Sequence, residues 1–330
     1  MKAKRILFST IIASIGITCI FIMNTRFDAL ARYSWYGELT DQQIKVINKE
    51  LDSKAINYII DYSIAPGFFM DFIGLENFNI YSIGDYRLIY DEYQYMLSKE
   101  LTISLVNRFL EKKINIDVLH QALSSDYYLE EINFYLDNYE TGIDLITNPK
   151  DYLLEFTEQN TLGNYRPKSL VLVEGIPQTN PDVEIYLELQ ALESLKVMCK
   201  ALEENFKAPC GGLELKAGYL SYEELTAIQN DYDESYYGSE RLLYQPGSSY
   251  FQLGVVVLFL PADDSEEWLN ESVLQWLWEN AHYYKFSSPI PPGTDGCVVG
   301  AGYPYYYRYI GTEQYWKEQD TGEGSNVCGV

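Results

Sequence analysis

The chain has 330 residues, a formal net charge of -24 and 47% hydrophobic residues. This hydrophobic content is enough to bury a sizeable core and excludes a wholly disordered protein. So large an acidic excess repels phosphate backbones and excludes nucleic acid as a partner. The 31 tyrosines are consistent with ordinary packing or with stacking surfaces for sugars and peptides.

Residues 1–26 predict a membrane anchor or a signal peptide. Basic residues precede the uncharged run 6–23, whose length is at the lower limit for a membrane-spanning helix. The alternative is a cleaved signal peptide, because Ala29-Leu30-Ala31 has the small-x-small form of a cleavage site. We therefore expect a membrane-anchored, extracytoplasmic protein of the cell envelope, or a secreted one if cleavage follows Ala31.

Residues 38–150 predict a helical N-terminal region. Thr40 followed by Gln43 is a capping-box pattern that begins one helix. Amphipathic spacing indicates two further helices, whose apolar positions are Ile103, Val106, Phe109 and Leu110 in one and Val118, Leu119, Ala122 and Leu123 in the other. His120 is the single histidine of this region, and we expect it to be structural or solvated.

Turn-forming residues near 150–165 mark a boundary, and residues 155–316 predict an α+β domain followed by a tail, 317–330. A long helix is expected from Asp182 to Glu204, with one buried stripe formed by Ile185, Leu189, Leu192, Leu195 and Met198. The remaining expected elements are strands around Leu213–Leu220, Tyr250–Leu260 and Tyr303–Tyr309, and a tryptophan-rich helix over Asp264–Tyr284.

Four cysteines lie beyond the apolar N-terminal run: Cys199, Cys210, Cys297 and Cys328. Four cysteines allow three pairings, and Cys199 with Cys210 and Cys297 with Cys328 would close the shortest loops. An exported protein can form disulfides, and free thiols are the alternative. The spacing of these cysteines is unlike that of a zinc site.

Five segments of the C-terminal half share their order and spacing with one known domain: Asn160–Leu170, Ala217–Leu225, Pro246–Ser249, Trp276–Phe286 and Tyr303–Gly311. The second is similar to Ser-Gly-Tyr-Arg-Ser-Tyr-x-x-Gln, and the last to Glu-Pro-Trp-His-x-Arg-Tyr-Val-Gly. Together they resemble the VanY-type D-alanyl-D-alanine carboxypeptidases of the LAS metallopeptidase group. The resemblance implies a small antiparallel sheet flanked by helices, here preceded by an all-helical extension.

The same resemblance implies a zinc ion held by two histidines and an aspartate, with a glutamate as the base. The corresponding positions of this chain are Phe251, Leu258 and Tyr306 for the ligands and Tyr303 for the base. The arginine and glutamine that would hold substrate are replaced by Leu220 and Leu225. His120 and His282 are the only histidines, and neither restores the ligand spacing. We expect that zinc is lost and that no cofactor is bound.

Two outcomes are open for the former active site. Its apolar and aromatic side chains can fill the pocket and extend the core. Alternatively, a groove remains that binds peptide or glycan by stacking and hydroxyl contacts. The expected lining of such a groove is Tyr219, Tyr222, Ser249, Tyr250, Tyr303, Tyr305, Tyr306 and Arg308.

The sequence therefore predicts a catalytically inactive relative of the carboxypeptidases that acts as a binding or scaffold module, with a peptidoglycan stem peptide or glycan as its partner. One alternative is an active D,D-carboxypeptidase-type hydrolase with a non-standard site, for which Asp263/Glu267 and Glu223/Glu224 are candidate carboxylate pairs. Another is a surface adhesion or assembly protein that works through residues 38–150.

Overall fold

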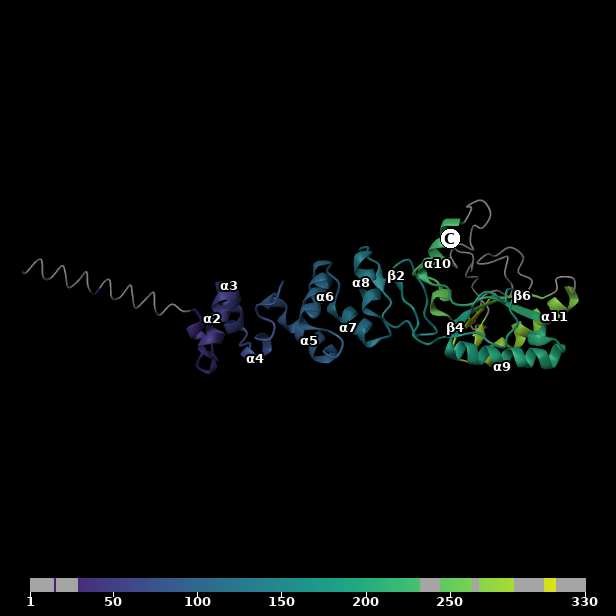
Figure 1. Cartoon of the computed structure of the whole chain (residues 1–330), viewed down its shortest axis with the longest axis horizontal. Helices are drawn as coiled ribbons and strands as arrows, with labels where there is room; N and C mark the ends of the chain where they lie inside the picture. The colour runs from purple at the N-terminus through teal and green to yellow at the C-terminus, as the bar shows by residue number, and fades with distance from the viewer. Residues whose placement is uncertain (1–14, 16–28, 232–243, 263–266, 288–305, 313–330) are drawn as a thin grey trace, which may run out of the picture. The chain divides into compact units, whose positions relative to one another are not determined.

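The computed structural model describes residues 15, 29–231, 244–262, 267–287 and 306–312 (Figure 1). The chain forms two compact units, residues 1–116 and 117–330. The expected anchor and the expected tail both lie outside the described residues, apart from Ile15. Among the residues that the structure describes, none forms a helix long and apolar enough to cross a bilayer.

The first unit is helical, and its elements are η1 (Ala29–Arg32), η2 (Tyr36–Glu38), α2 (Asp41–Glu50), α3 (Ser53–Asp61), α4 (Pro66–Phe69), η3 (Ile80–Ser82), α5 (Ile83–Tyr93) and α6 (Lys99–Glu111). The predicted capping box begins α2, since Thr40 Oγ1 accepts from the backbone N–H of Gln43 and the Gln43 side chain accepts from the backbone N–H of Thr40. Phe69, Phe72 and Phe109 are fully buried in the core. The described part of this unit is therefore helical, whereas residues 144–145 of the expected extension form strand β1 and pair with residues 160–161 in the second unit.

The second unit begins within α7 (Ile116–Ser124) and includes α8 (Leu129–Asp137), whereas the sequence indicated a boundary near residues 150–165. Contacts across that region explain the difference. Tyr127 Oη donates to Ile146 O at 2.7 Å, and its ring lies 4.9 Å from that of Tyr165. The short strands β1 (Asp144–Leu145) and β2 (Asn160–Thr161) also pair here in parallel. The turn-forming residues thus lie inside a packed unit.

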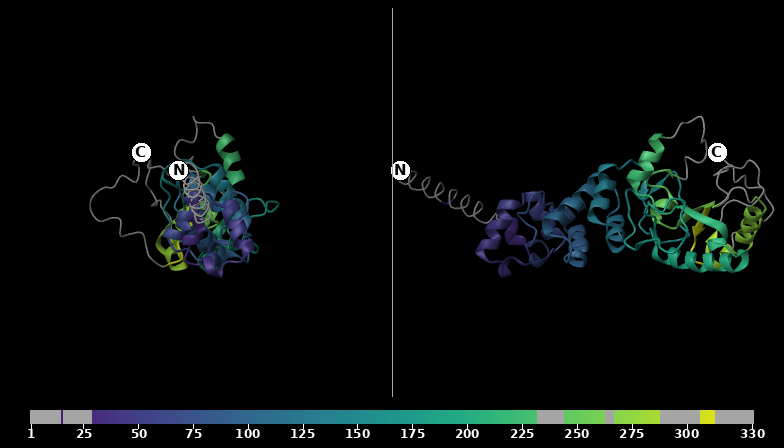
Figure 2. Two further views of the ribbon diagram at one scale, coloured as in Figure 1. Left: turned by 90° about the vertical axis from the view of Figure 1, so that its left-hand side faces the viewer. Right: turned by 45° about the vertical axis from the view of Figure 1, so that its right-hand side comes forward.

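The centre of the second unit is a four-stranded antiparallel sheet with the order β5-β6-β8-β7. Its strands are β5 (Leu213–Ala217), β6 (Val256–Pro261), β7 (Phe286–Ser287) and β8 (Tyr306–Tyr309). A smaller antiparallel pair consists of β3 (Leu170–Leu172) and β4 (Tyr186–Glu188). Helix α9 runs alongside the sheet (Figures 1 and 2). The α+β class predicted from the sequence is confirmed.

Helix α9 spans Leu189–Phe206 and begins later than expected, because residues 186–188 form strand β4. The Glu188 carboxylate accepts from the backbone N–H groups of Gln190 and Ala191 and so caps the helix. Ile185 lies before β4 and not in the helix, Leu189 is 43% exposed in the first turn, and the buried residues of the helix begin at Ala191. The predicted stripe is therefore wrong at Ile185 and Leu189.

The other elements of the second unit are η4 (Pro209–Gly212), α10 (Tyr222–Asp231), η6 (Tyr250–Leu253), α11 (Glu267–Asn280) and η7 (Ala281–Tyr284). The strand expected from Tyr250 begins only at Val256, because residues 250–253 form the 3-10 turn η6. A disulfide joins Cys199 in α9 to Cys210 in η4. Cys297 and Cys328 lie outside the described residues.

Candidate functional site

Three of the positions that the resemblance assigns to zinc chemistry meet in the second unit. Leu258 on β6 pairs with Tyr306 on β8, and the Phe251 ring lies 5.8 Å from the Tyr306 ring in an edge-on arrangement. These side chains belong to one buried cluster, which we call the filled cluster: Leu225, Tyr244, Phe251, Val256, Leu258 and Tyr306. Leu220 packs against its edge. Leu220 and Leu225, at the positions that the resemblance assigns to substrate-holding residues, thus join the same core.

The turn before β6 fixes the position of Phe251. Ser249 Oγ accepts from the backbone N–H of Phe251 and caps η6, and Gly254 ends that turn with φ +68. The positive φ of Gly254 favours glycine, and a Cβ there would also lie 3.1 Å from the backbone nitrogen of Glu188. This geometry directs Phe251 into the filled cluster.

The side chains of the filled cluster do not fit a zinc ion. Phe251 and Leu258 have no lone pair to donate, and burial raises the pKa of Tyr306 well above its ordinary value. Tyr306 therefore remains a neutral phenol at neutral pH. Within the described ranges, no three histidine, cysteine, aspartate or glutamate side chains are grouped to hold a metal. Tyr303 and Tyr305 lie outside those ranges.

Three members of the expected groove hold neighbouring backbone. The buried Arg308 donates from Nη2 to Tyr152 O and Leu154 O at 2.6 and 2.7 Å. Its guanidinium carbon lies 3.7 Å from the centre of the Tyr250 ring, and Tyr250 Oη donates to Leu154 O. Ser249 is buried as the cap of η6. Ser249, Tyr250 and Arg308 are thus engaged in packing, and none of them lines the larger pocket of this unit.

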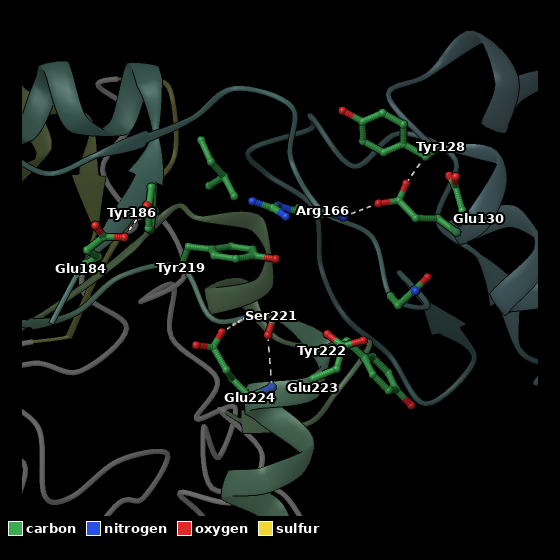
Figure 3. Close-up of a pocket in the computed structure, with 13 residues that line it drawn as sticks. Tyr128, Glu130, Arg166, Glu184, Tyr186, Tyr219, Ser221, Tyr222, Glu223 and Glu224 are labelled. Carbon is green, nitrogen blue, oxygen red and sulfur yellow. Dashed lines mark hydrogen bonds between the residues drawn. The ribbon is translucent and has the colours of Figure 1, made fainter.

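That pocket, which we call the open pocket, has a volume of about 700 Å³ (Figure 3). Of the described members of the expected groove, only Tyr219 and Tyr222 line it. The other lining residues were not predicted for the groove: Tyr128, Glu130, Glu131, Asn164, Arg166, Leu170, Glu184, Tyr186, Ser221, Glu223 and Glu224. Segment 217–225 separates the two environments, because Leu220 and Leu225 pack on the filled cluster while Tyr219 and Tyr222 face the open pocket.

Gly218 allows segment 217–225 to lie close against strand β4. A Cβ there would lie 2.6 Å from Tyr186 O, a distance that real structures avoid. The missing side chain allows the backbone N–H of Tyr219 to donate to Tyr186 O at 2.8 Å. Burial raises the pKa of Tyr219 to about 12, so its hydroxyl is a neutral hydrogen-bonding group at the pocket wall.

Glu131 joins two walls of the open pocket. Its carboxylate accepts from the backbone N–H of Tyr128 at 2.7 Å and from that of Arg166 at 2.7 Å (Figure 3). The side chain is 5% exposed, and burial raises the pKa of Glu131 to about 7, while the two backbone hydrogen bonds oppose the rise. The carboxylate therefore links the start of α8 to the segment that carries Arg166.

The start of α10 forms a third wall. Ser221 Oγ accepts from the backbone N–H of Glu224, and the Glu224 carboxylate accepts from the backbone N–H of Ser221, as in a capping box. Glu223 occupies the same first turn. The Tyr222 ring packs edge-on against Phe134 of α8, with ring centres 4.9 Å apart. The candidate carboxylate pair Glu223/Glu224 thus lies in the first turn of α10, where Glu224 caps the helix. The side chains of the other candidate pair, Asp263/Glu267, lie outside the described residues.

The sequence matches no protein-family model and no curated protein. Partial similarity is found to solved carboxypeptidase structures. The LdcB LD-carboxypeptidase is 22% identical, with 52% of this chain and 83% of that chain covered and a TM-score of 0.42. VanYB in complex with D-alanine-D-alanine is 21% identical, with 49% and 88% covered and a TM-score of 0.36. DacB from Streptococcus pneumoniae D39 is 24% identical, with 42% and 70% covered and a TM-score of 0.30.

Proposed function

We propose that this chain is a cell-envelope protein that binds a peptidoglycan stem peptide without cleaving it. It would be held at the membrane by residues 1–26, or secreted if cleavage follows Ala31. The ordered sequence segments that resemble VanY-type carboxypeptidases support this choice of ligand class. The partially similar structures include the LdcB LD-carboxypeptidase, which recognises peptidoglycan, and VanYB in complex with D-alanine-D-alanine.

One observation carries the proposal. Phe251, Leu258 and Tyr306 meet at one place and pack together as a buried apolar and aromatic cluster. Zinc catalysis needs nitrogen, oxygen or sulfur ligands and an open position for water. A packed cluster offers neither, so we propose that the zinc site has been lost while the neighbouring pocket retains a binding role.

Binding in the open pocket is chemically reasonable for a short peptide. Pockets of ~300–1,000 Å³ with aromatic walls and a few polar groups are typical of small-ligand sites. Tyr128, Tyr186, Tyr219 and Tyr222 supply the aromatic surface here. Their hydroxyls can hydrogen-bond a peptide backbone, and their rings can cover its apolar side chains.

The test is to titrate the full-length chain, purified in mild detergent, with a pentapeptide muropeptide in the presence of added zinc. Calorimetry measures binding, and chromatography of the same samples measures released D-alanine. We expect saturable binding and no D-alanine release. Tyr219→Ala should weaken binding, whereas Tyr62→Ala, at a tyrosine that is 71% exposed in the first unit, serves as the matched control.

Zinc-dependent release of the terminal D-alanine would overturn the loss of catalysis. If the muropeptide does not bind although circular dichroism shows that the chain is folded, the binding role is overturned. Equal weakening by Tyr219→Ala and Tyr62→Ala would show that the ligand is bound outside the open pocket.

A further inference from the structure

The charged side chains of the open pocket fall into two groups. Glu131 and Glu224 accept hydrogen bonds from backbone N–H groups, and Glu184 accepts from Tyr186 Oη at 2.7 Å. These three carboxylates already support the fold. Glu130, Glu223 and Arg166 form no side-chain hydrogen bond or ion pair with any described residue. This second group is available to a ligand.

Arg166 is placed by its backbone and not by its guanidinium. Its N–H donates to Glu131, and its side chain extends toward Tyr219 and Tyr186, away from Glu130 and Glu223 (Figure 3). Its charge reaches both rings, since the arginine opposes the rise in the pKa of Tyr219 and of Tyr186. A guanidinium presents paired N–H donors that match the two oxygens of a carboxylate. Glu184 shares this side but accepts from Tyr186 Oη, so the Arg166 guanidinium is the group here that can bind the carboxylate of a ligand.

The opposite side carries negative charge. Glu130 lies in the first turn of α8 and Glu223 in the first turn of α10, and both line the open pocket. Acidic residues in the first turn of a helix also stabilise that helix, so part of the reason for Glu130 and Glu223 is structural. Glu130 and Glu223 come from two different helices and line the same pocket, beside Tyr128 and Tyr222. Carboxylates and aromatic faces both attract an ammonium group, so this side of the pocket can bind one.

We infer that the open pocket selects a zwitterionic peptide, with its carboxylate at Arg166 and an ammonium group at Glu130 and Glu223. The inference rests on the proposed function and deepens it, because it names the two charges by which a stem peptide would be chosen. The excess of glutamates over the single arginine among the lining residues further favours a ligand whose net charge is zero or positive.

The experiment uses the full-length chain and three forms of one probe. The probes are L-lysyl-D-alanyl-D-alanine, its C-terminal amide, and its form acetylated on both amines. We expect the free peptide to bind and each blocked form to bind about tenfold more weakly, as expected for the loss of one charge-assisted contact. Affinity for the free peptide should fall as salt rises, because the contacts are partly exposed.

Variants test which residues bind the carboxylate and the ammonium group of the peptide. Arg166→Gln should remove the preference for the free carboxylate, so that the acid and the amide bind equally. Glu130→Gln combined with Glu223→Gln should remove the preference for the free amines. Lys200→Gln and Glu203→Gln on the exposed face of α9 are the matched charge controls, and they should leave both preferences unchanged.

The outcomes separate this inference from the proposed function. If the muropeptide binds but the three probe forms bind equally, the zwitterion inference is overturned and the binding role stands. If Arg166→Gln keeps the preference for the free acid, the carboxylate assignment is overturned. If the free tripeptide is selected while the muropeptide does not bind, the inference holds and the proposed stem-peptide role fails.

Discussion

The filled cluster and the open pocket lie on two sides of one short segment, 217–225. On one side, Leu220 and Leu225 pack with Phe251 and Tyr306, and the space is occupied by apolar and aromatic groups. On the other side, the same segment presents Tyr219 to a cavity with charged walls. A tightly packed cluster and an open, charged cavity can thus lie side by side, because different residues of a single segment face the two environments.

The largest expected effect comes from opening the filled cluster. Phe251 is 1% exposed, and Phe251→Ala should lower the free energy of unfolding by about 3–5 kcal/mol, through lost burial and an unfilled cavity. Urea denaturation measures the change. The matched control Tyr62→Ala should cost less than about 0.5 kcal/mol, since it is exposed. A loss below about 1 kcal/mol for Phe251→Ala would mean that the cluster is not packed.

A polar group returned to the cluster should also be destabilising. Leu258→Asp places a carboxyl in a buried apolar setting, so the loss of stability should be about 3 kcal/mol or more at pH 8. Burial raises the pKa of such a carboxyl, and the loss should therefore shrink at pH 5, where it is protonated more readily. Leu258→Asn is the control without a titrating group. Equal losses for the aspartate variant at both pH values would indicate that solvent reaches the cluster.

The pH dependence of stability tests whether the buried carboxyl of Glu131 holds the walls of the open pocket together. The folded pKa of this group, about 7, lies above its ordinary value of 4.5, so its ionisation is disfavoured in the folded state. Its contribution to stability should therefore be greatest below pH 4.5 and decline as the pH rises through 7, by about 1–3 kcal/mol. Glu131→Gln should remove this decline, and Glu203→Gln, at an exposed position of α9, should not. Identical pH profiles for the wild type and Glu131→Gln would contradict the account.

The smallest expected effect is on binding alone. Tyr219→Ala should weaken muropeptide binding by about 1–2 kcal/mol, near tenfold, because an aromatic wall of the open pocket is removed. Tyr219→Phe keeps the ring and should retain most of the affinity. Calorimetry of the two variants separates stacking from hydroxyl contacts. Stronger weakening by the phenylalanine than by the alanine substitution would contradict a stacking role.

Local signals in the sequence predicted the local structure. The Thr40 and Gln43 pair begins α2, and the alternation of Leu213 and Leu215 with charged residues forms β5, because both patterns depend on neighbouring residues. The start of α9 was missed because β4 is stabilised by pairing with β3, a partner that periodicity within one segment does not reveal. The ordered motifs also identified the second unit as α+β.

The open pocket was not predictable in the same way. Its walls are joined by the contact of Glu131 with Arg166, which are 35 residues apart, and by the approach of Gly218 to Tyr186. The boundary expected near residues 150–165 assigned Glu131 and Arg166 to separate domains, so their contact had no place in the prediction. Long-range backbone contacts of this kind leave no spacing pattern in the sequence.

Phe251, Leu258 and Tyr306, at the positions that the resemblance assigns to zinc ligands, pack together in the filled cluster. The most direct test of the proposed loss of the zinc site is the zinc content of the purified full-length chain, measured by elemental mass spectrometry without added chelator. The account predicts a value near zero per chain, because Phe251 and Leu258 cannot bind a metal and Tyr306 is buried as a neutral phenol. One zinc ion per chain would contradict it and would require a different set of ligands.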